Sequence, residues 1–596
     1  MRSEKNPAQQ RIALLRKALV EHHLCAWIAP TGDPHLSEYL PDHWAFRKYL
    51  SGFSGSAGTL VVTAKKAALW TDSRYWEQAG RQLAGSGIDL MRDGESGTPK
   101  IGEWLLANVP RNSVVGADLR TISSWKSLEI EQQLARRGIS LAHEDSIIDA
   151  IWTDRPAEST APVRPFEYGG ASRAAKLSRV RGAMRREDAD ALLISSLDDV
   201  AWITNLRGSD ILYTPVFTAF LLITRKSAHL FIDSGKVSAG IRKDLAADGI
   251  ECLPYESIWQ GALNLVPEHG TLWLDERRTC AHFFTQAEAA EFQIIRSLQP
   301  TLVLKAQKSS REISLIRKAM DLDGAALCEF YCWLEEELAR GTRLTEWDLS
   351  EKLHQCRKRS SHFIEESFAT IVAVDANAAE PHYTPSPERA ESLSGAKILL
   401  IDSGGQYDCG TTDITRTTVI GKIPFGFQRD YTAVLRGHIA LASARFPDGV
   451  FSSQLDTIAR VPVWQIDEDY GHGTGHGVGF HLSVHEGPVH ISPRAQAEES
   501  SRVHPGLVVS NEPGLYRAGL WGIRIENLVT AVKSLGMLRF ETLSLCPIDT
   551  RLIDLSALSR SEIWWINDYH RTCRKRLKPL LSEKAAKWLE SATRPL

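Results

Sequence analysis

The 596-residue sequence contains no run of about 18 uninterrupted apolar residues, the length that a membrane-spanning helix requires. Its first segment, MRSEKNPAQQRIALLRKALVEHH, is charged and has a helical pattern, and it lacks the hydrophobic region of a secretory signal. We therefore expect a cytoplasmic protein that has no membrane partner.

Cysteine is scarce and scattered. The nine cysteines form an odd set without a Cys-x-x-Cys pair, and Cys328 and Cys332 have the spacing of neighbours on one helix face. This pattern suits reduced intracellular thiols better than a disulfide framework.

An excess of charge of either sign is also missing. Lys and Arg number 70 against 73 for Asp and Glu, which gives a formal net charge of −3. Binding to nucleic acid normally requires a basic patch or stripe, so we expect no nucleic-acid partner. The hydrophobic content of 43% is that of an ordinary globular chain. Its length exceeds what one hydrophobic core organises, so several domains are expected.

A proline-rich segment separates two similar regions. Thr153–Pro165 (TDRPAESTAPVRP) is typical of an interdomain linker. On its two sides, TLVVTAKKAALWTD from Thr59 resembles FLLITRKSAHLFID from Phe220, with four identical residues 161 positions apart. Both predict a β-hairpin, and each follows a helical segment and an apolar strand. We infer two similar α/β domains.

A third region begins near KSSREISLIRKAM, where Ser309 and Glu312 have capping-box spacing. A second helix is expected at about 346–357, followed by apolar strands that include FATIVAV, AKILLID and GLVVSNEP. Helices followed by such strands favour an α+β domain with an antiparallel sheet. The tail after about residue 541 contains SEIWWINDYHRTCRKRL, an amphipathic helix expected to be a docking element.

The stretch HGTGHGVGFHLSVHEGP, from His472 to Pro488, is unusually rich in histidine and glycine. It is not the HExxH motif of zinc proteases, because His485 and His490 are five residues apart and Gly487-Pro488 opposes a helix. Its glycines also lack the spacing of a dinucleotide-binding loop. The interpretation that remains for this stretch is a metal site whose other ligands lie elsewhere in the chain.

Four acidic residues lie in apolar surroundings on both sides of this stretch. Asp402 ends an apolar strand, Asp413 follows eleven residues later, Glu512 ends another strand, and Glu526 is expected within a strand. Burying a lone carboxylate is costly, and divalent cations would offset that cost. Four carboxylates and one imidazole suit Mn²⁺, Co²⁺, Fe²⁺ or Zn²⁺.

The ordered set Asp402, Asp413, His476, Glu512 and Glu526 resembles the dinuclear site of the pita-bread metallopeptidases. Within that clan the chain resembles the aminopeptidase P family in its long three-domain form. The motifs that carry the resemblance are DPHLSEYLPDHWAFRKYLSGFSGSAGTLVVT, WTDSRYW, PHYTP, DSGGQYDCGTTDITRT, HGTGHGVG, VHEGP, NEPG, GIRIEN and WWINDYHRTC.

The resemblance implies a fold of two creatinase-type α/β domains, followed by a pita-bread catalytic domain and a C-terminal extension. We place these segments at 1–155, 166–307, 308–540 and 541–596.

The resemblance also implies roles for individual residues. Asp402 would bind one metal, His476 and Glu512 the other, and Asp413 and Glu526 would bridge both. His382, His472 and His485 would contact the substrate, Glu512 would transfer protons, and Arg524 would support the metal-binding carboxylates. Two divalent ions are expected as cofactors, with manganese first and zinc, cobalt or iron as alternatives.

Two positions depart from the family pattern. His481 follows Phe480 where a small residue and an aromatic are usual, so we expect it to line the domain without binding metal. Leu515 replaces a common tyrosine after NEPG, a change that would affect side-chain preference and leave the metals untouched.

The activity implied is removal of an N-terminal residue from peptides with proline in second position, by a homodimer. A prolidase, which cleaves Xaa-Pro dipeptides, uses the same ligands and is the nearest alternative. A methionine aminopeptidase usually lacks so large an N-terminal half. A non-catalytic binding protein or the metal-free creatine-cleaving relative would have lost several of the five ligands, all of which are present here.

Overall fold

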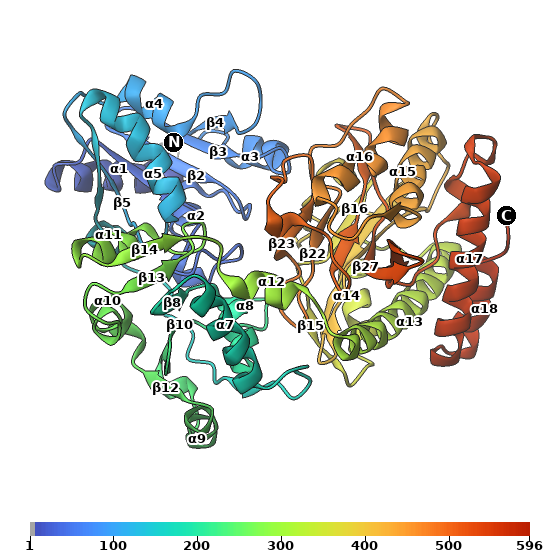
Figure 1. The fold of residues 1–596 in the computed structure, drawn as a ribbon. Helices are drawn as coiled ribbons and strands as arrows, with labels where there is room; N and C mark the ends of the chain where they lie inside the picture. Colours follow the sequence, from blue (N-terminus) through green and yellow to red (C-terminus); the bar gives the residue numbers. More distant parts are fainter. Residues whose placement is uncertain (1–5) are drawn as a thin grey trace. The chain divides into compact units, whose positions relative to one another are not determined.

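The structure, a computed structural model, describes residues 6–596, so residues 1–5 of the first expected domain lie outside it. It divides into two compact units. The first comprises the chain up to Leu212 together with Val216–Thr301, and the second comprises Tyr213–Pro215 and Leu302–Leu596 (Figure 1). Across residues 6–596, no helix has both the length and the apolar character to cross a membrane.

The first unit contains two six-stranded mixed sheets with the same strand order. In the first sheet the order is β4-β3-β2-β1-β5-β6, and in the second it is β12-β11-β10-β8-β13-β14. Corresponding neighbours also have the same relative direction. In the first sheet β2 is antiparallel to β1 and to β3, and the β1–β5, β5–β6 and β3–β4 pairs are parallel. The matching pairs of the second sheet have the same directions. The expected duplication of an α/β domain is confirmed.

The strands of the two sheets are short and mostly buried. In the first sheet they are β1 (Ala26–Pro30), β2 (Thr59–Thr63), β3 (Ala67–Thr71), β4 (Asp89–Arg92), β5 (Val114–Ala117) and β6 (Ser140–His143). In the second they are β8 (Ala191–Ile194), β10 (Ala219–Thr224), β11 (Ala228–Ile232), β12 (Ile250–Leu253), β13 (Thr271–Leu274) and β14 (Gln293–Arg296). The main helices of the two domains are α1 (Pro7–Glu21), α4 (Ile101–Asn108), α5 (Ser124–Leu134), α7 (Arg173–Arg186), α8 (Leu197–Thr204), α9 (Ala239–Ala247) and α11 (Ala281–Ala289).

The two predicted hairpins, β2–β3 and β10–β11, have the same turn. The hydroxyl of Thr63 accepts a hydrogen bond from the backbone N–H of Lys66 at 3.0 Å. The hydroxyl of Thr224 accepts one from Ser227 at 2.9 Å. A threonine at the end of the first strand therefore closes the turn in both copies, which explains why that residue recurs.

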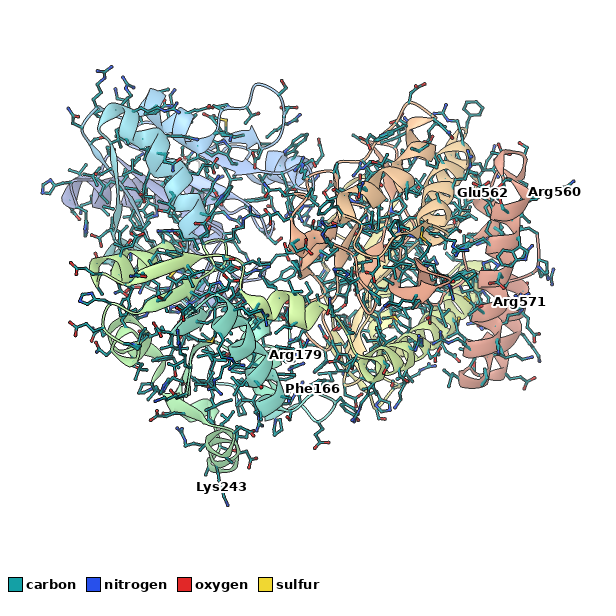
Figure 2. All side chains as sticks on the ribbon, in the orientation of Figure 1. Phe166, Arg179, Lys243, Arg560, Glu562 and Arg571 are labelled. Atoms are coloured by element: carbon teal, nitrogen blue, oxygen red, sulfur yellow. The ribbon has the colours of Figure 1, made fainter. Side chains whose placement is uncertain are left out.

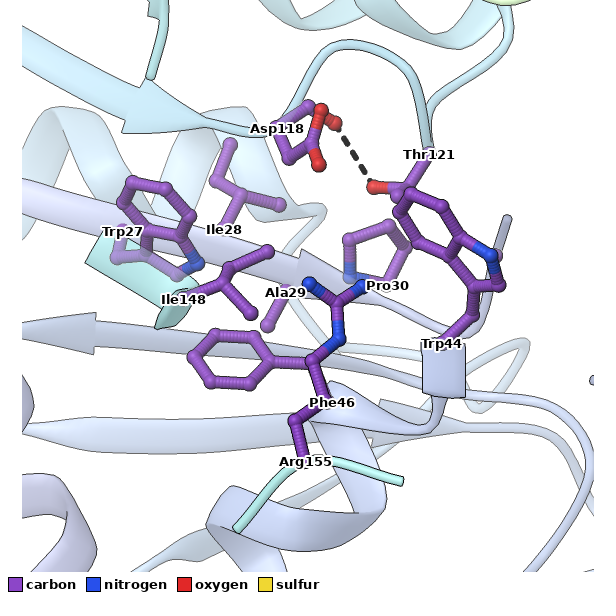
Figure 3. A pocket seen from close by; sticks show the side chains of 11 residues that line it. Trp27, Ile28, Ala29, Pro30, Trp44, Phe46, Asp118, Thr121, Ile148 and Arg155 are labelled. Atoms are coloured by element: carbon purple, nitrogen blue, oxygen red, sulfur yellow. Dashed lines mark hydrogen bonds between the residues drawn. The ribbon is translucent and has the colours of Figure 1, made fainter. Parts of the chain in front are cut away.

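The segment between the two domains has no regular structure from residue 152 to residue 163. Arg155 anchors its beginning, because its guanidinium lies 4.8 Å from the Trp44 ring centroid and donates to the His43 carbonyl at 2.7 Å and to Asp149 at 2.9 Å. Figure 3 shows the pocket that Arg155 enters. Its other lining residues are Trp27, Ile28, Ala29, Pro30, Gly32, Trp44, Phe46, Asp118, Thr121 and Ile148.

The second unit begins with helices, as expected. The helix α13 (Ser310–Arg340) has a reciprocal capping box between Ser309 and Glu312, and α14 spans Glu346–Arg357. Two further helices, α15 (Phe427–Ala442) and α16 (Ser452–Trp464), pack against each other. About half of the residues of α13 are buried, and most of these are apolar, so the helix is stabilised chiefly by packing.

All strand pairs of the second unit are antiparallel within the described residues, so the expected α+β catalytic domain is confirmed. The strands are β15 (Phe363–Glu366), β16 (Ile371–Val374), β17 (Ile398–Ser403), β18 (Gly405–Tyr407), β19 (Gly410–Thr411), β20 (Ile414–Val419), β21 (Arg445–Phe446), β22 (Gly475–Gly477), β23 (Glu486–Ile491), β24 (Val508–Asn511), β25 (Gly514–Arg517), β26 (Trp521–Arg524), β27 (Asn527–Ser534) and β28 (Met537–Thr542).

The tail forms two helices, α17 (Arg560–Leu577) and α18 (Glu583–Ala592). The helix α17 has Ser559 as its N-cap, and it packs against α13 and α15 of the same chain. Its buried residues are Ile566, Tyr569, His570, Cys573 and Leu577. The amphipathic helix therefore docks on the catalytic domain.

Candidate metal centre

Five residues from separate strands converge in the second unit. Asp402 lies in β17, Asp413 precedes β20, His476 lies in β22, and Glu512 follows β24. Glu526 lies between β26 and β27, so the expectation that it sits within a strand was wrong. Its backbone N–H donates to the Thr415 carbonyl at 3.1 Å, which brings it beside the strand that follows Asp413. Strands distant in sequence thus bring the ligands together.

Distances between the side chains suit a metal site. The Nε2 atom of His476 lies 3.5 Å from Asp413 Oδ2 and 3.5 Å from Glu512 Oε1. Asp413, His476 and Glu526 each offer one ligand atom, and these atoms all lie within 4.8 Å of one another. Such a cluster of ligand atoms at the ends of buried strands is what a divalent ion requires.

The imidazole of His476 is oriented for binding through Nε2. Its Nδ1 atom lies 3.0 Å from the Gly477 carbonyl, so Nδ1 carries a proton and Nε2 faces the carboxylates of Asp413 and Glu512. Without a metal, the neighbouring acids Asp413 and Glu512 outweigh burial and raise the pKa of His476 to about 9. A cation in this position would replace that proton.

Two of the buried carboxylates, Asp402 and Glu526, have raised pKa values despite their hydrogen bonds. Burial raises the pKa of Asp402 to about 6 against the opposing effect of Arg524, and burial together with Asp413 and Glu512 raises the pKa of Glu526 well above its usual value. Oδ1 of Asp402 is buried and has no hydrogen-bond partner within the described residues. A buried carboxylate oxygen without a hydrogen-bond partner, close to other acids, has the chemistry of a cation ligand.

Arg524 and Tyr516 connect Asp402 with His472. The Nη2 atom of Arg524 donates to Asp402 Oδ2 at 2.5 Å, and Nη1 donates to the Tyr516 hydroxyl at 2.7 Å. That hydroxyl lies 2.8 Å from His472 Nε2, whereas His472 Nδ1 lies 2.8 Å from the Gly473 carbonyl. His472 is therefore a neutral imidazole with both nitrogens engaged, and burial lowers its pKa to about 4.

The position of His485 is set from both sides. Its ring centroid lies 4.3 Å from that of His476, with the rings nearly perpendicular. The next residue, Glu486, is buried, and its carboxylate accepts from Lys305 at 2.9 Å and from Lys308. This buried group of three charges fixes the start of β23 and thereby the His485 backbone.

The loop that carries His382 approaches the same site. The carbonyl of Pro381 accepts from Arg524 Nη2 at 3.3 Å. A Cβ atom on Gly522 would lie 1.7 Å from the Ala378 carbonyl, so only glycine lets β26 pack this closely against the segment before His382. The half-buried His382 therefore lies on a segment whose neighbouring residues contact Arg524 and pack against β26.

Two glycines of HGTGHGVG lie where neighbouring backbone comes very close. A Cβ atom on Gly475 would lie 2.0 Å from the Ser510 carbonyl, and one on Gly477 would lie 2.2 Å from the Glu486 carbonyl. These glycines allow the neighbouring strands to pack closely. His481 is buried and has a φ of 48°, and it lies in a bend before β23. The segment from His481 to His485 is not a strand, so strand alternation does not decide whether their side chains share a face.

Sequence reasoning missed three polar residues of the site. Thr415 donates to Glu526 Oε2 at 2.7 Å, and Ser510 accepts from the His476 backbone at 2.9 Å and donates to Glu512 Oε1 at 3.2 Å. Tyr516 is the third. Thr415 and Ser510 are fully buried, whereas Tyr516 is half-buried, and a buried hydroxyl requires a hydrogen-bond partner.

Comparison with protein families and known structures agrees with this arrangement. The chain matches metallopeptidase family M24 over residues 314–533 and its C-terminal region over 536–596. The creatinase/prolidase N-terminal domain matches over 11–151 and again over 154–312.

Full-length relatives extend the match. The Xaa-Pro aminopeptidase ApepP of Drosophila melanogaster is 38% identical over 96% of this chain and 96% of its own length. Aminopeptidase P2 of Arabidopsis thaliana is 37% identical over 96% of this chain and 86% of its own length. The crystal structure of the X-prolyl aminopeptidase from Caenorhabditis elegans, described as a cytosolic enzyme with a dinuclear active site, is 34% identical with a TM-score of 0.94, over 99% of this chain and 100% of that one.

Fold and site together define a metallopeptidase of family M24 with two creatinase-type N-terminal domains. More narrowly, the chain belongs to the Xaa-Pro aminopeptidase (aminopeptidase P) family, which confirms the resemblance drawn from its motifs.

Proposed function

We propose that the protein hydrolyses the N-terminal Xaa-Pro bond of peptides at a dinuclear centre held by Asp402, Asp413, His476, Glu512 and Glu526. The observation that carries the proposal is that Asp413, Glu512 and Glu526 gather around His476, while the buried Asp402 interacts electrostatically with Asp413 and Glu512 and leaves its Oδ1 unpartnered. Two divalent cations would balance these charges, and the oxygen-rich ligand set favours Mn²⁺, with Zn²⁺, Co²⁺ and Fe²⁺ as alternatives.

Divalent ions at this centre would lower the pKa of water and so provide a nucleophile near neutral pH. Glu512 is the proposed proton carrier, taking the proton of the attacking water and passing it to the departing proline nitrogen. Its side chain, 18% exposed, reaches solvent more than those of Asp402 and Asp413, at 12% and 5%. Exposure of this kind suits a group that meets substrate.

The histidines would hold the substrate during this step. His485, beside His476, and His382 would donate to the charge that develops on the scissile carbonyl or hold the carbonyl after proline. His472 would orient the substrate from the wall that Tyr516 and Arg524 support. Arg524 keeps Asp402 ionised through its 2.5 Å hydrogen bond.

A comparison of peptide lengths tests the activity. We expect Ala-Pro-Ala to be cleaved to alanine and Pro-Ala with a kcat/KM at least about 10-fold above that for Ala-Pro, a transition-state difference of about 1.4 kcal/mol. The physical reason is that residues beyond proline add binding contacts. Strict use of the dipeptide would instead identify a prolidase, and Ala-Ala-Ala is the control for the proline requirement.

We also propose that the enzyme is a cytoplasmic homodimer, as its similarity to a relative described as cytosolic supports. Large apolar side chains are exposed on adjoining segments of the catalytic unit: Phe425, Val461, Trp464, Leu520 and Trp564. Arg436 of α15 joins two of these segments, since it contacts Glu562 of α17 and Gln465 after α16. Exposed apolar side chains on neighbouring segments are a feature of protein interfaces.

Sedimentation velocity tests the assembly. We expect a single species of twice the chain mass of 66.3 kDa at micromolar concentration. A 66.3 kDa species alone would contradict the dimer.

A further inference from the structure

A buried guanidinium binds the backbone at and beside two of the proposed ligands. Arg416, in β20, is 2% exposed. Its Nη1 atom donates to the Thr415 carbonyl at 2.9 Å and to the Glu526 carbonyl at 2.7 Å. One side chain therefore binds the backbone two residues after Asp413 and the backbone of Glu526 itself.

The remaining donors of Arg416 point toward the C-terminal region. Its Nη2 atom donates to the Cys546 carbonyl at 2.7 Å and to the Tyr569 hydroxyl at 2.7 Å. The hydrogen bonds of this buried cation therefore go to carbonyls, an amide and a phenol instead of a carboxylate. A buried cation without a carboxylate partner depends on these hydrogen bonds for its stabilisation, so the positions of the acceptors determine where the guanidinium lies.

Tyr569 joins α17 to this group. Its hydroxyl accepts from Arg416 and from the Cys546 backbone N–H at 3.1 Å, and its proton faces Asn527 Oδ1 at 3.2 Å, the Ser544 carbonyl at 3.1 Å and the Cys546 carbonyl at 3.0 Å. Tyr569 is 5% exposed, and Trp565 stacks on its ring at 5.4 Å. Arg560 and Arg571, labelled in Figure 2, belong to the exposed side of the same helix.

The network continues to a third ligand. The Nδ2 atom of Asn527 donates to Nε2 of the fully buried His438 at 3.0 Å. The Nδ1 atom of His438 donates to the Asn511 carbonyl at 3.1 Å, and Asn511 returns a bond to the His438 carbonyl at 2.9 Å. Asn527 follows Glu526 and Asn511 precedes Glu512, so the contacts lie next to the ligands on both strands.

We propose that Tyr569, in the C-terminal region, is a positioning residue of the metal centre. Its hydroxyl holds Arg416 and Asn527, and these two hold the backbone around Asp413 and Glu526, the ligands proposed to bridge the metals. The helix α17 is in this way part of the support of the catalytic site as well as a packing element. The inference rests on the ligand set given under the proposed function.

Tyr569→Phe tests the inference, because it removes the hydroxyl and keeps the ring. Outer contacts of metal sites typically change metal affinity by about 10- to 100-fold. We expect Mn²⁺ affinity at one or both sites to fall at least about 10-fold, measured by competition with a fluorescent chelator. At limiting Mn²⁺ kcat should fall by a similar factor with KM within about twofold, and excess Mn²⁺ should restore part of it.

Tyr407→Phe is the matched control. Tyr407 is also buried, and its hydroxyl donates to Asp323 at 3.0 Å. Asp323 leads through Arg357 to the Ser403 hydroxyl of β17, so this variant leaves the hydrogen bonds of Arg416 and Asn527 in place. Both variants lose a buried hydrogen-bonded hydroxyl, so both are expected to lower the melting temperature, but only Tyr569→Phe should weaken Mn²⁺ binding. Equal Mn²⁺ affinity of Tyr569→Phe, Tyr407→Phe and wild type would overturn the inference. Wild-type protein that binds no Mn²⁺ would instead refute the ligand set on which it rests.

Discussion

Asp413→Asn is expected to lower kcat/KM for Ala-Pro-Ala by at least about 100-fold and to leave fewer than two bound metal ions for each chain. Asp413 lies 3.5 Å from the Nε2 atom of His476 and within 4.8 Å of a Glu526 ligand atom, so its carboxylate faces two other ligands. Asparagine has nearly the same shape but only one acceptor oxygen and no charge. The substitution therefore removes the charge of a proposed metal ligand without opening a cavity.

Metal content by mass spectrometry and steady-state kinetics measure the effect. Asp408→Asn is the control, since Asp408 is five residues away and pairs with His362 at 2.9 Å, outside the ligand cluster. That variant should keep the metals and the activity. Full metal content and wild-type kcat/KM in Asp413→Asn would show that the cluster is not the catalytic centre.

Glu486→Gln is expected to destabilise the second unit by about 3 kcal/mol. The carboxylate of Glu486 is the shared partner of Lys305 and Lys308, and all three side chains are at most 3% exposed. Glu486→Gln removes the counter-charge that two buried ammonium groups share, which costs far more than the loss of an exposed pair. Because His485 adjoins Glu486, kcat should fall as well.

The pH dependence of this effect has a defined sign. Burial would raise the pKa of Glu486, but Lys305 and Lys308 outweigh it and the pKa lies below its ordinary value. A lowered pKa in the folded state contributes stability above the unfolded-state pKa of about 4.3 and loses it as the pH falls through the folded-state value. The difference in melting temperature between wild type and Glu486→Gln should therefore be full at pH 7 and shrink below about pH 4.

Glu541→Gln is the control for this prediction, because the Arg317–Glu541 pair has side chains 36% and 30% exposed. Exposed pairs contribute about 0–1 kcal/mol, so its melting temperature should change little. If Glu486→Gln melts no lower than Glu541→Gln at pH 7, the buried charges do not hold the start of β23.

Much of the fold could be predicted because its signals are local. The capping box at Ser309 and Glu312 marks the start of α13, and the two hairpins repeat because each needs a threonine at the same turn position. The duplicated sheets then follow from two similar segments. The position of Glu526 was less accessible, because a two-residue break between β26 and β27 has no distinct composition.

The ligand set and the supporting Arg524 were proposed from motifs, but the tyrosines that support them could not be. Tyr516 reaches His472 and Arg524, and Tyr569 reaches Arg416, only after strands and helices distant in sequence have packed. In the sequence, Tyr569 is one aromatic residue of an amphipathic helix, and such residues are usually packing residues. A hydrogen bond between residues that are far apart in the chain leaves no periodic pattern in the sequence.

The central claim is that catalysis depends on divalent metals held by the convergent carboxylates and His476. The most direct measurement is a titration of chelator-treated wild-type enzyme with Mn²⁺, in which bound metal and Ala-Pro-Ala hydrolysis are followed together. We predict negligible hydrolysis in the metal-free protein and a rise to full activity as two Mn²⁺ bind to each chain. Full activity in protein shown to be metal-free would contradict the account.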